Sequence, residues 1–240
     1  NIGYARGMNV GYQVIVKHGL KYVAFVTNDL VIAHGSMSIG IEYLSQYDDV
    51  ACVQGVLYVP DGRLWSAGCY LDELMGAGTI CGGISKVECP GIHKPQEPTY
   101  LDGAYIICKT EVLKRLGTPF IDETFAYLDD NLLGLRLWNT GYKLLFVPHD
   151  FGIHYVSQTF RRTGLQRYYA LRSRIAGLVA TEVPRKYAKK LYLFKLSILS
   201  RKIYKDGTQL GKLIVDRIGK LSLCKAPYLR LSAYDAYLSA

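Results

Sequence analysis

The sequence has six cysteines but no C-x-x-C pair, and the spacing of the six matches no zinc site. This pattern excludes the common structural zinc motifs. It favours free thiols, several of them in strands or in the core, in a reducing compartment, and so predicts a cytoplasmic protein. The six residues are Cys52, Cys69, Cys81, Cys89, Cys108 and Cys224.

The sequence also lacks any run of the roughly 18–20 apolar residues needed to span a bilayer. It has neither G-x-x-x-x-G-K-[ST] nor a G-x-G-x-x-G after a strand, so Gly3, Gly7 and Gly11 form only a weak phosphate-binding motif. Half of the 240 residues are hydrophobic and 20% are charged. This composition is globular, and it can bury a core in one domain or in one domain with an extension.

Positive charge is scarce in the first two thirds of the chain and abundant in the rest. Residues 1–160 contain 11 Lys and Arg against 16 Asp and Glu, a net charge of −5, whereas residues 161–240 contain 18 against 4, a net charge of +14. An acidic globular part followed by a basic tail predicts an anionic partner for the tail, either membrane phospholipid or nucleic acid.

Short apolar runs alternate with helical patterns over residues 1–160. Strands are expected at 22–26, 50–59, 100–109 and 142–148, the last stopped by Pro148. Helices are expected at 8–20, at 36–46 with Ser36 as N-cap, at 110–116 and at 129–140. A turn is expected at 60–63 and a glycine-rich, mobile loop at 76–91. The alternation predicts an α/β domain with a Rossmann-like, mostly parallel sheet flanked by helices, followed from about residue 160 by a helical basic extension.

Two groups of acids stand where chemistry is expected. Asp29 follows the run 22–26, where an acid can ligate a divalent metal that faces an anionic substrate, or can cap the next helix. Asp129 and Asp130 begin a helical pattern, where two acids interact favourably with the helix dipole. Because aromatic and aliphatic neighbours desolvate this pair and raise the pKa of a carboxylate, it can also supply a general base.

Histidine offers a weaker signal near the end of the first part. His154 follows the predicted strand 142–148 and is a candidate metal ligand, with His149 as an alternative. A lone histidine is more often a satisfied polar residue than a ligand, so this residue alone decides nothing.

The order of these pieces along the chain resembles the family 2 glycosyltransferases of GT-A fold, and most of all their rhamnosyltransferase-like branch. The motifs are N-x-G-[YF]-A-x-G-x-N-x-G, a strand ending in N-D, then D-G-A, F-x-Y-x-[ED]-D-x-x-L-x-x-R, G-Y-K, V-P and a histidine. They stand at residues 1–11, 27–29, 102–104, 125–136, 141–143, 147–148 and 154. The likeness covers roughly residues 1–180.

The resemblance implies transfer of a hexosyl or deoxyhexosyl group, with inversion, from a nucleoside diphosphate sugar to an acceptor hydroxyl. The acceptor would be a glycan or lipid-linked glycan, as in polysaccharide biosynthesis. Asp130 matches the catalytic base and Asp129 its acidic neighbour. Asp29 matches the last acid of a DxD-type motif that holds Mg²⁺ or Mn²⁺, and His154 matches a histidine near that metal.

Further site residues follow from the same likeness. Donor contacts are expected from Asn1, Gly3, Arg6 and Asn28, and acceptor-side contacts from Asp102 and Gly103.

The chain departs from the family pattern in several places. The DxD-like triplet is Thr27-Asn28-Asp29, without its first carboxylate, and Leu132 replaces a common acid. The strands and helices that precede the N-x-G segment in relatives, including the strand that grips the nucleotide base, are absent from this sequence. This absence predicts a half-formed nucleotide site that needs a partner chain or is inactive.

The basic tail predicts contact with a membrane surface. Residues 167–178 resemble a Y-x-x-R-N helix of the family, with Ser173 in place of Asn. The segment 190–204 places Leu191, Phe194 and Ile198 on one face, with charges at Lys190, Lys195, Arg201 and Lys202. Such a helix can lie on anionic lipid, or can pack on its own domain with a solvated basic face. The rivals to a transferase are a non-catalytic or partner-dependent GT-A-like module and a nucleic-acid-binding protein. The latter is disfavoured because no recognition motif or aromatic platform is present.

Overall fold

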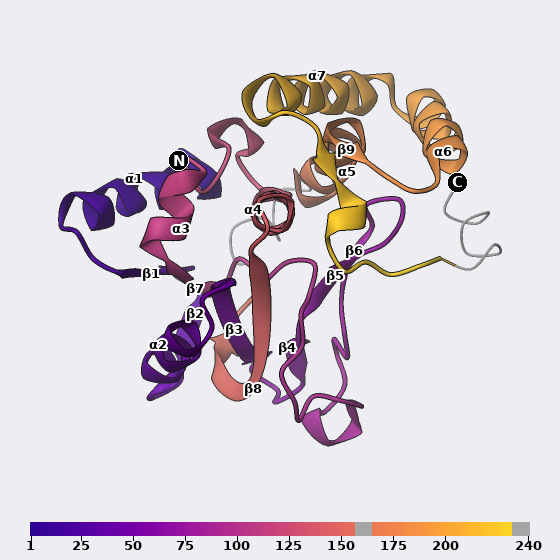
Figure 1. Ribbon diagram of the computed structural model, residues 1–240. Helices are drawn as coiled ribbons and strands as arrows, with labels where there is room; N and C mark the ends of the chain where they lie inside the picture. The colour runs from indigo at the N-terminus through magenta and orange to yellow at the C-terminus, as the bar shows by residue number, and fades with distance from the viewer. Residues whose placement is uncertain (157–164, 232–240) are drawn as a thin grey trace.

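The computed structural model describes residues 1–156 and 165–231, and it shows a central sheet flanked by helices (Figure 1). The helices are α1 (Tyr4–Lys17), α2 (Ser36–Gln46), α3 (Thr110–Arg115), α4 (Asp129–Asn139), α5 (Leu165–Ala180), α6 (Lys186–Leu199) and α7 (Arg201–Ile218). The strands are β1 (Tyr22–Val26), β2 (Leu30–Ile32), β3 (Val50–Tyr58), β4 (Leu64–Ser66), β5 (Cys69–Leu71), β6 (Ala77–Thr79), β7 (Tyr105–Lys109), β8 (Lys143–His154), β9 (Thr181–Glu182) and β10 (Leu221–Ser222). The α/β fold with a helical C-terminal part is as predicted.

The direction of the strands corrects the expectation of a mostly parallel sheet. The main sheet has the order β1-β7-β3-β8-β2, with β4 paired to β3, and of these pairs only β3 and β8 run parallel. A parallel neighbour needs a crossover that returns to the starting end of the strand. The chain between β3 and β7 makes no such helical crossover, so β7 enters the sheet from the end at which β3 leaves it.

The strand expected to stop at Pro148 instead continues to His154. Its pairing with β3 shifts register there, since Gln54 lies opposite Phe146 but Val56 lies opposite Asp150. Proline is tolerated within a strand at such an irregularity because no ladder hydrogen bond is required of its nitrogen. The bulge therefore lets β8 reach the sheet edge with His154 at its end.

Helices cover both faces of this sheet. In β7, Ile106 and Cys108 belong to a core cluster with α1, α3 and α4, whereas Tyr105 and Ile107 pack with Leu44 of α2. This alternation is the period of two that a strand imposes on its side chains. Ser36 is the first residue of α2, and its hydroxyl lies 3.3 Å from that of Tyr105, so the predicted N-cap role is wrong and Gly35 takes that position.

The predicted helix at 8–20 is also displaced, because α1 begins at Tyr4, where the backbone N–H of that residue donates to the carbonyl of Phe125 at 2.8 Å. Two glycines of the opening segment, Gly7 and Gly11, therefore lie inside a helix. This contact fastens the N-terminal segment to the chain just before α4.

The C-terminal helices pack together on the side of the sheet that carries α4 (Figure 1). A Cβ at Gly207 of α7 would lie 2.7 Å from the carbonyl of Arg172, so α5 and α7 approach closely. The helix predicted over 190–204 is broken: Ser200 separates α6 from α7, and its side chain accepts the N–H of Ile203. The predicted domain boundary near residue 160 lies outside the described residues, and one core cluster contains residues from both predicted parts.

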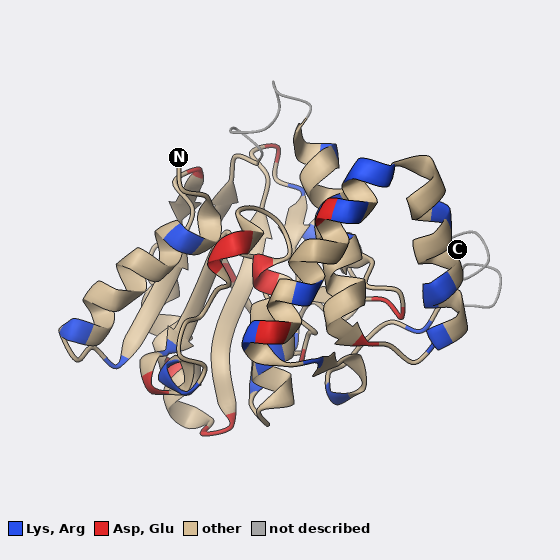
Figure 2. Ribbon diagram, turned by 90° about the horizontal axis from the view of Figure 1, so that it is seen from above, with Lys and Arg blue, Asp and Glu red and all other residues tan. Residues whose placement is uncertain are grey.

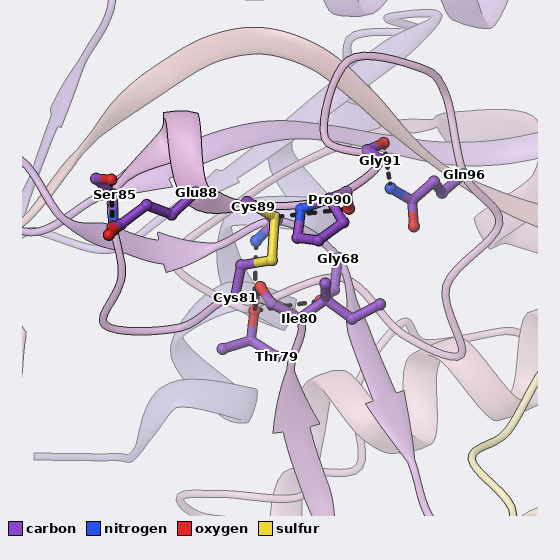
Figure 3. Close-up of a disulfide and its surroundings, with 11 residues drawn as sticks. Gly68, Thr79, Ile80, Cys81, Ser85, Glu88, Cys89, Pro90, Gly91 and Gln96 are labelled. Carbon is purple, nitrogen blue, oxygen red and sulfur yellow. Dashed lines mark hydrogen bonds between the residues drawn. A yellow bond between two sulfur atoms is a disulfide. The ribbon is translucent and has the colours of Figure 1, made fainter.

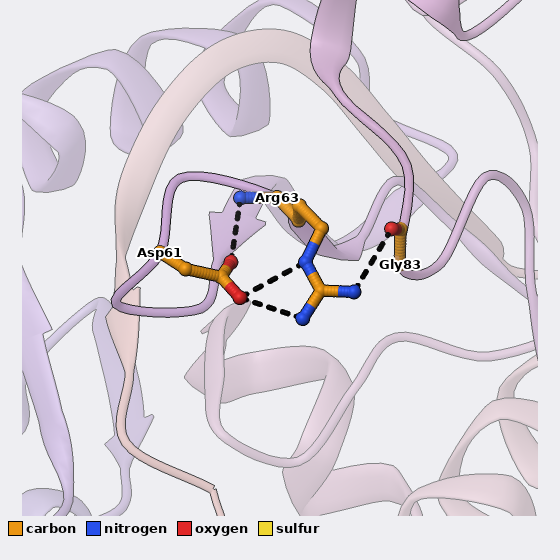
Figure 4. A network of polar contacts seen from close by, with 3 residues as sticks. All are labelled: Asp61, Arg63 and Gly83. Carbon is orange, nitrogen blue, oxygen red and sulfur yellow. Dashed lines mark hydrogen bonds and ion pairs between the residues drawn. The ribbon is translucent and has the colours of Figure 1, made fainter.

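The predicted turn at 60–63 is confirmed, and it joins β3 to β4 as a hairpin. The N–H of Val59 donates to the carbonyl of Arg63 at 2.9 Å. Asp61 accepts from Arg63 Nη2 at 2.6 Å, and the same guanidinium reaches the carbonyl of Gly83 (Figure 4). These contacts connect the hairpin to the glycine-rich segment.

The prediction of six free thiols is wrong for four of them. Cys52 and Cys108 form one disulfide and Cys81 and Cys89 another (Figure 3). Cys52 and Cys108 face each other on neighbouring antiparallel strands, a pairing that the separation of 56 residues conceals from any reading of spacing. Free thiols are Cys69 and Cys224, so the cysteines no longer support a reducing compartment.

The glycine-rich segment 76–91 is more structured than the predicted loop. It contains β6, the 3-10 turn Lys86–Glu88 and the Cys81–Cys89 bond (Figure 3). Across residues 1–156 and 165–231, no helix combines the length and the apolar character that crossing a membrane requires.

Candidate active site

A cleft of about 860 Å³ lies at one edge of the main sheet. The residues after β1, those before β7, the start of α4 and the end of β8 all reach it. They meet because β7 runs opposite to β1, so the first residues of one strand lie beside the last residues of the other. Its volume is within the range of ligand sites in proteins. The charged lining from described residues is Asp29, Asp102, Asp129, Asp130, His154 and Arg174.

Asp29 and His154 form the first pair in this cleft. Strand β2 pairs with β8 so that Leu30 lies opposite His154, which places the preceding residue beside the imidazole. The two side chains are 3.3 Å apart, from His154 Nε2 to Asp29 Oδ1. His154 is 8% exposed, and its Nδ1 has no hydrogen-bond partner within the described structure. Asp29 and His154 therefore place one oxygen and one nitrogen that could ligate a metal side by side on the cleft wall.

Asp102 is held in place by a buried amide. Gln54 Nε2 donates to the carbonyls of Asp102 and Tyr105 at 2.7 and 2.6 Å, and Gln54 Oε1 accepts the N–H of Asp102 at 3.0 Å. Trp65 Nε1 donates to Asp102 Oδ2 at 2.9 Å, while the ring of Trp65 packs edge-on against His154. Burial raises the pKa of Asp102, and the N–H of Ala104 opposes that shift.

Asp130 faces the same turn from the start of α4. Its Oδ2 accepts the N–H of Gly103 at 3.2 Å, and its Oδ1 accepts the N–H of Asn131 at 2.9 Å. A Cβ at Gly103 would lie 3.1 Å from the hydroxyl of Tyr4, so the close approach favours glycine. Burial, and then the negative charge of Asp102, raise the pKa of Asp130 to about 7. A carboxylate with this pKa can accept a proton near neutral pH.

Asp129 is more enclosed than its neighbour. It is 4% exposed, and the hydroxyl of Thr124 donates to its Oδ1. Burial raises the pKa of Asp129 to about 8, with the hydrogen bond from Thr124 opposing and the charge of Asp130 adding to the shift. The two acids are therefore distinct: Asp130 lies against the Asp102–Gly103 turn, and Asp129 lies against the segment before α4.

That segment has an unusual backbone. Phe125, Tyr127 and Leu128 have φ of 64°, 63° and 73°, a left-handed conformation that costs roughly 1–3 kcal/mol for each residue with a side chain. The carbonyl of Phe125 accepts the N–H of Tyr4, and those of Ala126 and Tyr127 lie near the hydroxyl of Ser173 on α5. The flanking helices therefore hold a costly conformation that aims the first turn of α4 at the cleft.

Most residues predicted for the site lie around this cleft. Its lining includes Asn1, Gly3, Asn28, Asp29, Asp102, Gly103, Asp129, Asp130 and His154. Arg6 is exposed on α1 and is not among the lining residues. His149 lies in mid-strand, 3.4 Å from the hydroxyl of Tyr43, and is also outside the lining.

Several contributors were not predicted. Gln54, Trp65 and Tyr4 support the Asp102–Gly103 turn, and Arg174 of α5 brings a cation to the cleft. Gln54 gave one signal: it is a polar residue inside an otherwise apolar strand, and a buried amide must find partners.

Comparisons with known proteins give no match to any protein-family model and none to any curated protein. A solved structure described as "Crystal structure of GalNAc-T7 with UDP, GalNAc and Mn2+" is similar, with a TM-score of 0.56 and 16% identity, over 91% of this chain and 41% of that chain. The chain has the GT-A glycosyltransferase fold. It thus spans less than half the length of this structural relative of GT-A fold.

A second solved structure is the mannosyltransferase PcManGT from Pyrobaculum calidifontis in complex with GDP-Man and Mn²⁺. It aligns with a TM-score of 0.45 and 14% identity, over 86% of this chain and 64% of that one. The predicted assignment to family 2, and to its rhamnosyltransferase-like branch, stays a prediction within the GT-A fold.

Proposed function

We propose that this protein transfers a hexosyl or deoxyhexosyl group from a nucleoside diphosphate sugar to an acceptor hydroxyl, with inversion at the anomeric carbon. The observation that carries the proposal is the carboxylate of Asp130, in a cleft of GT-A topology, with its pKa raised to about 7. The acceptor is a glycan or lipid-linked glycan, as in polysaccharide biosynthesis, and the branch is the rhamnosyltransferase-like one of family 2.

In the proposed step, the acceptor oxygen bonds to the anomeric carbon on the face opposite the diphosphate. Asp130 takes the hydroxyl proton as that bond forms. The bond from the anomeric carbon to the diphosphate oxygen breaks, and its electron pair leaves with the nucleoside diphosphate. Asp102 and Gly103 contact the acceptor side, and the N–H groups of Gly103 and Asn131 keep Asp130 in place. Asp129 is its acidic neighbour in the same helical turn.

Other residues of the cleft lining are assigned to donor binding. Asn1, Gly3 and Asn28 line the cleft. Arg6 is exposed outside this lining, so it can contact only a part of the donor that extends out of the cleft. The acids of the cleft lining outnumber its one arginine among the described residues, Arg174, so a diphosphate donor needs a neutralising cation there.

A divalent metal, Mg²⁺ or Mn²⁺, fits at Asp29 and His154. Among the described residues no group of three or more His, Cys, Asp or Glu forms a complete metal site. Two adjacent donors 3.3 Å apart suit an ion that takes further ligands from phosphate oxygens. When bound there, the ion supplies positive charge to the leaving diphosphate. The similar structure determined with UDP and Mn²⁺ supports this choice.

The proposal predicts how turnover depends on pH. Because the pKa of Asp130 is raised to about 7, its base form is lost as pH falls below that value. We expect kcat/KM to rise from about pH 6 to about pH 9, with apparent pKa values that belong to the pair Asp129 and Asp130. A flat profile over this range, measured as release of nucleoside diphosphate, would exclude Asp130 as the base.

Donor binding is tested by titration calorimetry with UDP, GDP and dTDP, with and without Mn²⁺. We expect metal-dependent binding of one nucleotide, weakened at least tenfold in Asp29→Ala because one of two metal donors is removed. Asp49→Ala, which removes an exposed acid outside the lining residues, is the matched control.

Binding of no nucleotide by the wild type would reject a working donor site in this chain. The protein would then act as a non-catalytic or partner-dependent module with a GT-A fold. Equal nucleotide binding by the wild type and by Asp29→Ala would instead show that Asp29 is not a metal ligand.

A further inference from the structure

Helix α6 presents an exposed apolar stripe on the surface of the protein. We define the α6 stripe as Tyr187, Leu191, Phe194 and Ile198, which successive turns of the helix bring to one side. Tyr187 is 81% exposed, Phe194 62% and Ile198 67%, and Leu191 is half-buried. Large side chains with this exposure on consecutive turns are a mark of an interaction surface.

The opposite side of α6 is already used for folding. Tyr192 and Leu193 pack against the core cluster that includes α5 and α7 residues. Lys189 donates to the carbonyl of Thr181 at 2.9 Å and is half-buried. The α6 stripe is therefore a second apolar face, beyond the one that attaches the helix to its own domain.

The charge beside the α6 stripe selects its partner. Helix α6 contains four lysines and no acid. Lys186 and Lys190 are exposed and lie along one border of the stripe, and Lys and Arg recur on α6 and α7 in Figure 2. An apolar stripe bordered by unbalanced cations complements a surface that is apolar inside and anionic at its rim. A bilayer with anionic headgroups has both properties, whereas a second copy of α6 would place lysines against lysines.

Helix α6 adjoins the cleft through Tyr192, which lies on the side of the helix opposite the stripe. The guanidinium of Arg174, which lines the cleft, is stacked over the ring of Tyr192 at 4.6 Å. We propose that the α6 stripe inserts into the headgroup region of an anionic bilayer and attaches the protein to that surface through the side of α6 that faces away from the core. Lipid binding by α6 stands on these observations and does not rest on the proposed glycosyl transfer.

Flotation with phosphatidylcholine vesicles, with and without phosphatidylglycerol, tests this proposal. We expect binding only when phosphatidylglycerol is present. Phe194→Ser should weaken this binding by more than about tenfold, because it removes one aromatic ring that would be buried in the bilayer. Lys186→Gln with Lys190→Gln should weaken it by about 30-fold at low salt, since each interfacial lysine contributes about fivefold.

Controls of equal chemistry lie elsewhere on the surface. Val87 is 88% exposed, so Val87→Ser removes an exposed apolar side chain far from α6 in sequence, and Lys17→Gln with Lys21→Gln removes two exposed charges. Thermal melting and nucleotide binding should be unchanged in all variants, so loss of lipid binding and loss of donor binding remain separate results.

Three results would overturn the proposal. The first is equal binding of the wild type and the α6 variants to vesicles. The second is equal binding of the wild type to vesicles with and without phosphatidylglycerol. The third is a change of molecular mass in light scattering when Phe194 is replaced, which would assign the stripe to contact between copies of the chain.

Discussion

Asp130→Asn is expected to lower turnover of the donor by about 10²–10⁴-fold, the usual contribution of a positioned general base. The amide of Asn keeps the size of the side chain, and its oxygen can still accept the N–H of Gly103, which lies 3.2 Å from Asp130. It cannot take a proton from the acceptor. We therefore expect Mn²⁺-dependent nucleotide binding to be retained while release of nucleoside diphosphate is lost.

The same substitution has an expected effect on stability. The pKa of Asp130 in the folded protein, about 7, is above that of an unfolded aspartate. The stability that follows from this shift is present in acid and is lost as pH rises through about 7. Asn carries no charge and does not titrate. The melting temperature of Asp130→Asn relative to that of the wild type should therefore increase as the pH rises from about 5 to about 8.

Asp129→Asn is the matched control, because Asp129 lies one residue away but accepts from Thr124 on the side toward the preceding segment. We expect a smaller loss of turnover from it than from Asp130→Asn. Full activity in Asp130→Asn, or a greater loss in Asp129→Asn, would assign the base to another residue.

Removal of the Cys52–Cys108 bond is expected to lower the free energy of unfolding by about 4 kcal/mol. The bond joins residues 56 apart, and closing a loop of this length restricts the unfolded chain by that amount in the chain-entropy description. The double variant Cys52→Ala with Cys108→Ala should show the loss in urea unfolding at equilibrium. A loss of this size is a large part of the stability of an ordinary domain.

The second disulfide gives a graded comparison. Cys81 and Cys89 are only 8 residues apart, so their replacement should cost less, about 2.5 kcal/mol. Cys224→Ser changes an exposed free thiol and should leave stability within about 0.5 kcal/mol. Alkylation of all six thiols in the denatured, unreduced protein would contradict both bonds, since only Cys69 and Cys224 should then react.

The sequence by itself determined several local elements and the places of the candidate acids along them. The run 22–26 became β1 and the pattern 36–46 became α2 with the predicted bounds, since an apolar β-branched run and a helical period are signals within a few residues. Asp29 was expected at the end of β1, and Asp129 and Asp130 at the start of α4, for the same local reasons. The resemblance to glycosyltransferases then predicted that these acids share one site, and they line one cleft.

The tertiary structure decided everything that depends on partners distant in sequence. It set the antiparallel course of β7, which brings Asp102 beside Asp130, and it paired Cys52 with Cys108. It also carried β8 past Pro148 to His154, because the neighbouring strand accepts a register shift there. Strand direction, cross-strand pairs and buried hydrogen bonds depend on which segments meet, and this is fixed only when the whole core packs.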